Sequence, residues 1–240
     1  MRKNKMMRLA SALLVAVLLT TCAISGTFAK YVTSDTSADS ARVAKWGVSV
    51  VASGDDLFNN EYTDTTHGLT VKSEDDKNVV APGTSNTEFG AAGLTFTIEG
   101  APEVAVKITY DFKAIEDIYL GTGTYADDTT GDDTDFYVVT GDPYYPVVYT
   151  LTKDGSEVAK GNLAAIDTYF ENLTTSSTLI AANTTLDAVY VLTWAWDFGD
   201  SANNTKDTTL GNLAAGTTTT TNDFNLDLSY SLTITIEQVD

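Results

Sequence analysis

Several stretches of the chain alternate between apolar and polar residues, which is the period of β-strands with one buried face. The longest runs from Phe224 to Ile236, where single polar residues separate the apolar ones. A helix would scatter these apolar residues around its axis, so the stretch is predicted to be a strand. Similar patterns predict strands at 46–51, 94–98, 104–112, 147–152 and 190–198.

Two local signals interrupt the strand pattern. Asp154-Gly155 lies between the strand at 147–152 and a short one at 157–159, and this dipeptide favours a hairpin turn with positive φ. From Leu163 to Leu173 the apolar residues recur at helical spacing, with Asn162 placed to cap the first turn. This is the one helix that the pattern predicts. The stretch 62–78 is polar and weakly patterned. The stretch 216–222 holds five threonines in a row and is expected to be an exposed loop.

Strands at this spacing, joined by turns rich in Gly and Asp, predict an all-β fold: a two-sheet antiparallel β-sandwich with one short helix. Residues 46–240 are expected to form a single domain, with an aromatic and acidic insertion near 115–146. Composition alone does not distinguish a jelly-roll from an immunoglobulin-like topology.

The N-terminus has the order of a secretory signal peptide. Four cationic residues precede an apolar run from Leu9 to about Ile24, and small residues flank Phe28. We therefore expect residues 1–29 to be removed between Ala29 and Lys30. A retained anchor is the alternative, but the run is shorter than the ~20 apolar residues of a membrane span. Lipid attachment at Cys22 fits poorly, because Thr occupies a position before it where Gly, Ala or Ser is usual.

Two segments near this junction carry a family resemblance. Residues 26–31, reading GTFAKY, are followed by SARVAKW at 40–46, and this combination resembles the SipW-dependent signal peptide and mature N-terminus. APGT at 81–84 and GAPEVAV at 100–106 strengthen the match. The chain thus resembles the TasA/camelysin family of Firmicute surface proteins. The resemblance implies a jelly-roll-like sandwich, secretion, and processing by a dedicated signal peptidase.

The resemblance also implies a role for residues 30–45. In TasA-like proteins each subunit is thought to lend its N-terminal strand to the next, which gives a head-to-tail polymer. Here the apolar residues of that segment, Tyr31, Val32, Ala38 and Val43, are scattered among polar ones, so we expect a mobile segment that can add to a sheet edge. The expected function is a structural subunit of an extracellular fibre or biofilm matrix, with related matrix subunits as further partners. A tail beside a monomer is the alternative.

Charge and cysteine content restrict the partners. Removal of residues 1–29 takes away four positive charges and no negative one, which changes the formal charge from −19 to −23. Such a balance opposes binding to nucleic acid and anionic membrane surfaces. Cys22 is the only cysteine, so the processed chain has no thiol and suits an oxidising exterior. No permanent membrane anchor is expected.

The sequence contains few motifs of known catalytic sites. Its many carboxylates leave a glycosidase-like pair open, although in so acidic a chain such a pair is expected by chance. His67 is the only histidine, which excludes zinc sites that need several histidines, including the H-E-x-x-H motif. It lies between Thr66 and Gly68 in a polar stretch, so we expect it to be a loop residue and not a catalytic base. Camelysin relatives carry a metalloendopeptidase label, but this chain has no residues to support it. We expect no enzyme. The alternative function is a surface-exposed ligand-binding or carbohydrate-binding module that uses Tyr125, Tyr144 and Tyr145.

One acidic run is a candidate calcium site, the only cofactor that the sequence suggests. The carboxylates flank Gly131 and belong to Asp127, Asp128, Asp132, Asp133 and Asp135. Oxygen ligands on a glycine-containing loop suit Ca²⁺, although the spacing differs from that of an EF-hand. A solvated acidic loop is the alternative.

Overall fold

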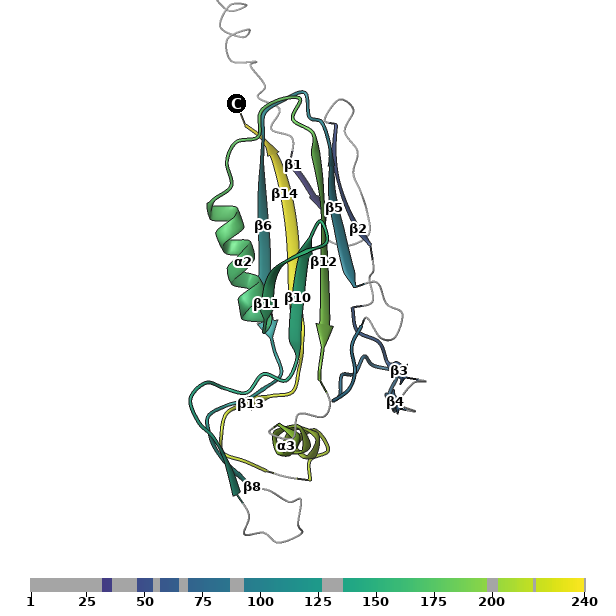
Figure 1. Cartoon of the computed structure of the whole chain (residues 1–240), viewed down its shortest axis with the longest axis vertical. Coiled ribbons are helices and arrows are strands. Elements are labelled where there is room, and N and C mark those ends of the chain that lie inside the picture. The colour runs from purple at the N-terminus through teal and green to yellow at the C-terminus, as the bar shows by residue number, and fades with distance from the viewer. Residues whose placement is uncertain are drawn as a thin grey trace, which may run out of the picture. The chain divides into compact units, whose positions relative to one another are not determined.

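The computed structural model describes residues 32–35, 47–53, 57–64, 69–86, 93–126, 136–197, 203–217 and 219–239. This part of the chain is mostly β-strand in antiparallel sheets, with two helices (Figure 1). The strands are β1 (Val32–Asp35), β2 (Val48–Ser53), β3 (Glu61–Asp64), β4 (Leu69–Lys72), β5 (Leu94–Gly100), β6 (Val106–Glu116), β7 (Tyr119–Leu120), β8 (Gly123–Ala126), β9 (Phe136–Val139), β10 (Val148–Lys153), β11 (Ser156–Gly161), β12 (Leu186–Ala195), β13 (Phe224–Asn225) and β14 (Ser229–Gln238). The helices are α2 (Leu163–Thr175) and α3 (Asn204–Ala214).

The largest sheet has five strands in the order β11-β10-β12-β5-β2. Its central strand, β12, pairs with β10 on one side and β5 on the other. The β10–β11 hairpin turns at Asp154 and Gly155, which have φ values of 50° and 77°. The predicted turn with positive φ is thereby confirmed.

A second sheet has the order β1-β14-β6. β14 and β6 pair over almost their whole length, from Ser229 opposite Glu116 to Gln238 opposite Val106. Three smaller sheets, β13-β7, β3-β4 and β8-β9, lie outside these two. The β13–β7 pair joins segments that directly precede β14 and follow β6.

Both larger sheets and α2 contribute aromatic rings to one hydrophobic core. Phe96 of β5 stacks on Tyr190 of β12 with ring centroids 4.7 Å apart. The ring of Tyr110 on β6 lies 6.0 Å from that of Tyr190, and Phe170 of α2 stacks on Phe112 of β6 at 5.5 Å. Side chains from the two sheets and α2 are therefore buried against one another, which is the main favourable term in folding.

Helix α2 begins as the sequence predicts. The side chain of Asn162 accepts a hydrogen bond from the backbone N–H of Ala165 at 3.1 Å, so Asn162 is the N-cap. Leu163, Ile166 and Phe170 are the buried residues of the helix. Its predicted apolar face is therefore confirmed, and the helix continues two residues beyond Leu173.

The structure differs from the sequence pattern in three places: it corrects the expectations of one helix and of an unbroken strand at 224–236, and it has a hairpin where no element was predicted. A second helix, α3, forms at 204–214, where the sequence pattern predicted none. Only Thr209, Leu210 and Leu213 of this helix are buried, so its apolar residues recur too rarely to show helical spacing. The polar stretch 62–78 contains most of the β3–β4 hairpin. The predicted strand at 224–236 is divided, because residues 226–228 lie between β13 and β14 and belong to neither.

Candidate functional site

The N-terminal strand β1 covers part of one edge of β14 (Figure 1). The two strands are antiparallel, with Val32 opposite Glu237 and Asp35 opposite Ile234. β1 has four residues and β14 has ten, so β1 lies opposite less than half of its partner. Ile234 and Ile236 of β14 are buried, which ties this part of the ladder to the core.

The other edge of this sheet is covered by different means. The hydroxyl of Thr174 on α2 accepts from the backbone N–H of Tyr110 and donates to its carbonyl, each at 2.8 Å. Further along β6, Val106 and Ile180 form an antiparallel bridge. Groups within α2 and after it thus bond to this edge at Tyr110 and Val106, whereas β1 pairs with the β14 edge.

A groove of about 400 Å³ lies beside residues 226–228, directly before β14. Its walls come from α3, from the end of β12 and from the segment 78–82. The lining is mainly apolar and includes Leu226, Leu228, Leu210, Trp196 and Pro82. Asp207 and Asp227 add carboxylates to the lining. A groove with this size and mixture of groups is suited to an apolar partner with positive charge.

One carboxylate holds two walls of the groove together. Oδ1 of Asp207 accepts hydrogen bonds from the hydroxyl of Tyr144 at 2.7 Å and from the indole N–H of Trp196 at 3.1 Å. The ammonium group of Lys206 lies 4.7 Å from the centroid of the Tyr144 ring. These contacts fix α3 against the end of β12, although its own sequence is a weak helix former.

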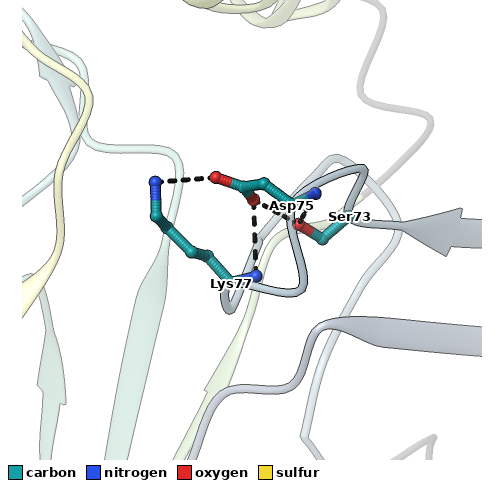
Figure 2. Close-up of polar contacts among 3 residues, drawn as sticks. All are labelled: Ser73, Asp75 and Lys77. Carbon is teal, nitrogen blue, oxygen red and sulfur yellow. Dashed lines mark hydrogen bonds and ion pairs between the residues drawn. The ribbon is translucent and has the colours of Figure 1, made fainter.

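A compact turn leads into the segment that forms another wall of the groove (Figure 2). Oδ1 of Asp75 accepts from the Ser73 hydroxyl at 2.8 Å and from the Lys77 backbone N–H at 3.3 Å. The Lys77 ammonium lies 2.7 Å from Oδ2. These bonds, chiefly the one from the Lys77 ammonium group, lower the pKa of Asp75 to about 2. Gly83 then donates to the Trp196 carbonyl at 2.8 Å, which joins the segment to β12.

A buried carboxyl group lies at the N-terminus of α2. Oδ2 of Asp117 accepts from the backbone N–H of Leu163 at 2.9 Å, and its Oδ1 is buried without a hydrogen-bond partner among the described residues. Burial raises its pKa to about 6, although the N–H groups of Leu163 and Ile118 act in the opposite direction. The charge of Asp117 also contributes to the raised pKa of Tyr149, behind burial itself.

Most of the site residues expected from the sequence lie outside the described residues. This holds for the five aspartates of the calcium candidate, Asp127, Asp128, Asp132, Asp133 and Asp135, and for the cleavage residues Ala29 and Lys30. It also holds for His67 and for Tyr31, Ala38 and Val43 of the donor segment. Val32 is the first residue of β1.

The three tyrosines of the alternative binding function have defined positions. Tyr125 is buried, and its hydroxyl donates to the Gly121 carbonyl at 2.8 Å, so it presents no exposed ring. Tyr144 is half-buried and bonded to Asp207. The ring of Tyr145, also half-buried, lies 5.6 Å from that of Tyr119.

The sequence reasoning missed the groove, because α3 and the divided strand were not predicted. The only direct signal was the Trp196 position at the end of an alternating stretch.

In the part of the chain that the structure describes, no helix is long and apolar enough to cross a membrane, and no three His, Cys, Asp or Glu side chains are grouped to hold a metal ion. Comparisons with family models, curated proteins and solved structures gave no match for this chain.

Proposed function

We propose that this protein is a secreted structural subunit of an extracellular fibre or biofilm matrix, of the TasA/camelysin type, assembled by exchange of its N-terminal strand. The observation that carries the proposal is the pairing of β1 with the edge of β14. β1 is the first described element of the chain, and it occupies the position that a donated strand would take.

In strand exchange, β1 leaves β14 of its own chain and pairs in the same register with β14 of a neighbouring subunit. β1 pairs through only four residues, so few contacts must break before it leaves its own β14. The same backbone hydrogen bonds then form with a second copy, which makes such exchange inexpensive. Because each subunit donates at one end and accepts at another, the contact is heterologous and extends into a fibre when it does not close.

The architecture proposed with this function is a jelly-roll-like two-sheet sandwich. Antiparallel pairing in both larger sheets supports it, as does the shared aromatic core around Tyr190. The acidic charge supports a protein that binds neither nucleic acid nor anionic membrane surfaces. We further propose that it is not an enzyme, that a dedicated signal peptidase releases it, and that related matrix subunits join the polymer. Calcium binding by the 127–135 loop stays a prediction.

A pair of engineered cysteines tests strand exchange. Ser34 and Thr235 lie opposite each other across the β1–β14 ladder, and antiparallel partners lie within disulfide reach. Residues 30–240 contain no native cysteine, so Ser34→Cys with Thr235→Cys gives one possible disulfide. We expect oxidation at high protein concentration to give a ladder of covalent oligomers on a denaturing non-reducing gel.

The matched control is Thr152→Cys with Val191→Cys, which bridges β10 and β12 in the middle of the larger sheet. This pair should give cross-linked monomer only, because β10 and β12 each pair with a strand on both sides within the five-stranded sheet. If the Ser34–Thr235 pair also gives only cross-linked monomer at every concentration, β1 does not exchange and the polymer proposal fails.

The ligand-binding or carbohydrate-binding module is the second candidate, and the groove with Trp196 in its lining favours it. Trp196 is only 5% exposed, which leaves little ring face for stacking on a sugar. A glycan-array signal that is lost when Tyr144 and Tyr145 are replaced by Ala would support this candidate over the structural subunit.

A further inference from the structure

The edge of β14 continues beyond the part that β1 covers. β1 pairs with residues 234–237, and the N-terminal half of β14 and residues 226–228 follow in the direction in which β1 runs. Residues 226–228 line the groove between α3 and the end of β12. A strand that extended β1 along the same edge would therefore arrive at this groove.

The register of the β1–β14 ladder indicates which residues of the extended strand would lie opposite the groove. Val32 lies opposite Glu237, and each step forward on β1 is one step back on β14. If the register continued past the start of β14 at Ser229, it would place Arg42 opposite Asp227. The same extension would place Ala41 and Val43 opposite the two flanking leucines, Leu228 and Leu226.

The chemistry of the two partners is complementary. The sequence from Ala41 to Trp46 reads ARVAKW, with two cations among apolar residues, whereas the stretch 32–40 contains no cation and two aspartates. The groove is lined mainly by apolar side chains and by the carboxylates of Asp207 and Asp227. In a chain with a formal charge of −19, a basic segment of this kind is uncommon and suits an acidic groove.

The same chain cannot deliver this segment to its own groove. Gly47 accepts a hydrogen bond from the Ala101 N–H at 2.8 Å, which places it at the end of β5 that pairs with Leu186. Trp196, in the lining of the groove, lies ten residues further along than Leu186, a rise of about 33 Å. Four residues from Val43 to Gly47 span at most about 14 Å.

We propose that the groove beside residues 226–228 is the receptor for residues 41–46 of a neighbouring copy of this chain. The inference rests on the proposed strand exchange and names the site at which the donated segment ends. Arg42 of the neighbour pairs with Asp227, and its apolar residues fill the groove. Only an exchanged segment covers the β14 edge along its full length, which favours the polymer over the closed monomer.

The first test is a cysteine pair that joins only neighbouring copies. Val43→Cys with Leu226→Cys, in residues 30–240, should give covalent oligomers and no cross-linked monomer. Ser34→Cys with Thr235→Cys is measured in parallel, because it reports strand exchange without involving the groove. Oligomers from the Ser34 pair without oligomers from the Val43 pair would leave strand exchange intact and overturn the groove proposal.

The second test reverses the charges of the proposed ion pair between Arg42 and Asp227. Arg42→Glu and Asp227→Arg should each slow oligomer formation by the Ser34–Thr235 pair, by roughly twofold to fivefold as for an exposed ion pair. The combined variant should recover the original rate. Asp227 is exposed, and its carbonyl, not its carboxylate, accepts the hydrogen bond from Asn225, so folding should tolerate the change.

The control for the second test is Asp142→Arg, an exposed residue outside the groove lining. It should neither slow assembly nor restore it in combination with Arg42→Glu. Recovery with Asp142→Arg equal to that with Asp227→Arg would mean that net charge alone acts, and would overturn the specific pairing. Loss of oligomers from both cysteine pairs would overturn strand exchange itself.

Discussion

The Thr174 hydroxyl of α2 takes the place of a neighbouring strand at Tyr110 of β6. It accepts from the Tyr110 N–H and donates to the Tyr110 carbonyl, each at 2.8 Å. An edge residue normally leaves these two groups for water or for another chain. The side chain of a helix residue therefore occupies the position of a neighbouring strand at this point of the β6 edge, whereas the β14 edge pairs with β1.

Replacement of Thr174 by Val should destabilise the fold by about 1–3 kcal/mol, because two partly buried backbone groups lose their partner while the side-chain shape is kept. Urea unfolding measures the change. Thr168→Val is the control, since the Thr168 hydroxyl bonds only to the Ala164 carbonyl of the same helix and is exposed. Equal effects of the two substitutions would contradict a special role for Thr174.

Asp117 should make the stability of the fold depend on pH. Its folded pKa of about 6 lies above the ordinary 3.8, so the folded state holds the proton more tightly. The resulting stabilisation is fully present below pH 3.8 and is lost as the pH rises through 6. Asp117→Asn does not titrate, so its stability relative to the native protein should rise between pH 4 and 7, on the order of 1 kcal/mol after allowance for solvent screening. Urea midpoints at both pH values measure this, and a constant difference would contradict it.

Asp207 should be needed for the contact between α3 and β12. Asp207→Ala removes the acceptor for Tyr144 and Trp196, and should cost about 2–3 kcal/mol. It should also shift tryptophan emission to longer wavelength, because water reaches the Trp196 indole. Asp207→Asn keeps an acceptor oxygen and should lose less. Unchanged emission in the Ala variant would show that the groove wall does not depend on this carboxylate.

Two glycines should respond to alanine in opposite ways. Gly211 lies within α3 with open space around the position of a Cβ, so Gly211→Ala should stabilise the fold by about 0.5–1 kcal/mol. Gly100 has φ of 130°, and a Cβ there would overlap the Gly47 carbonyl. Gly100→Ala should therefore destabilise the pairing of β2 with β5. Thermal unfolding of both variants tests this prediction. A shift of the unfolding temperature in the same direction for both variants would contradict it.

Secretion of the full chain should yield a protein that begins at Lys30. Intact-mass measurement of the exported product tests the signal-peptide prediction, since the positively charged start and the apolar run are typical of removed segments. Retention of residues 1–29, or a lipid on Cys22, would contradict it.

The sequence by itself determined which segments form the main strands and helix α2. Alternation at 104–112 and 190–198 corresponds to β6 and β12, where Ile108, Phe112, Leu192 and Trp194 are buried. A two-residue period has to place these side chains on one face, and Asn162 supplies a local hydrogen bond that starts α2. Such signals are local, so they are readable without knowledge of the fold.

Tertiary contacts alone decided the rest. The pentapeptide GNLAA occurs at 161–165 and at 211–215, yet the first copy begins α2 and the second ends α3. The difference comes from partners far along the chain: Asp117 accepts from the N–H of Leu163, whereas α3 is held through Asp207 by Tyr144. The pairing of β1 with β14 likewise joins the two ends of the described chain, and no local pattern encodes which edge the N-terminal segment meets.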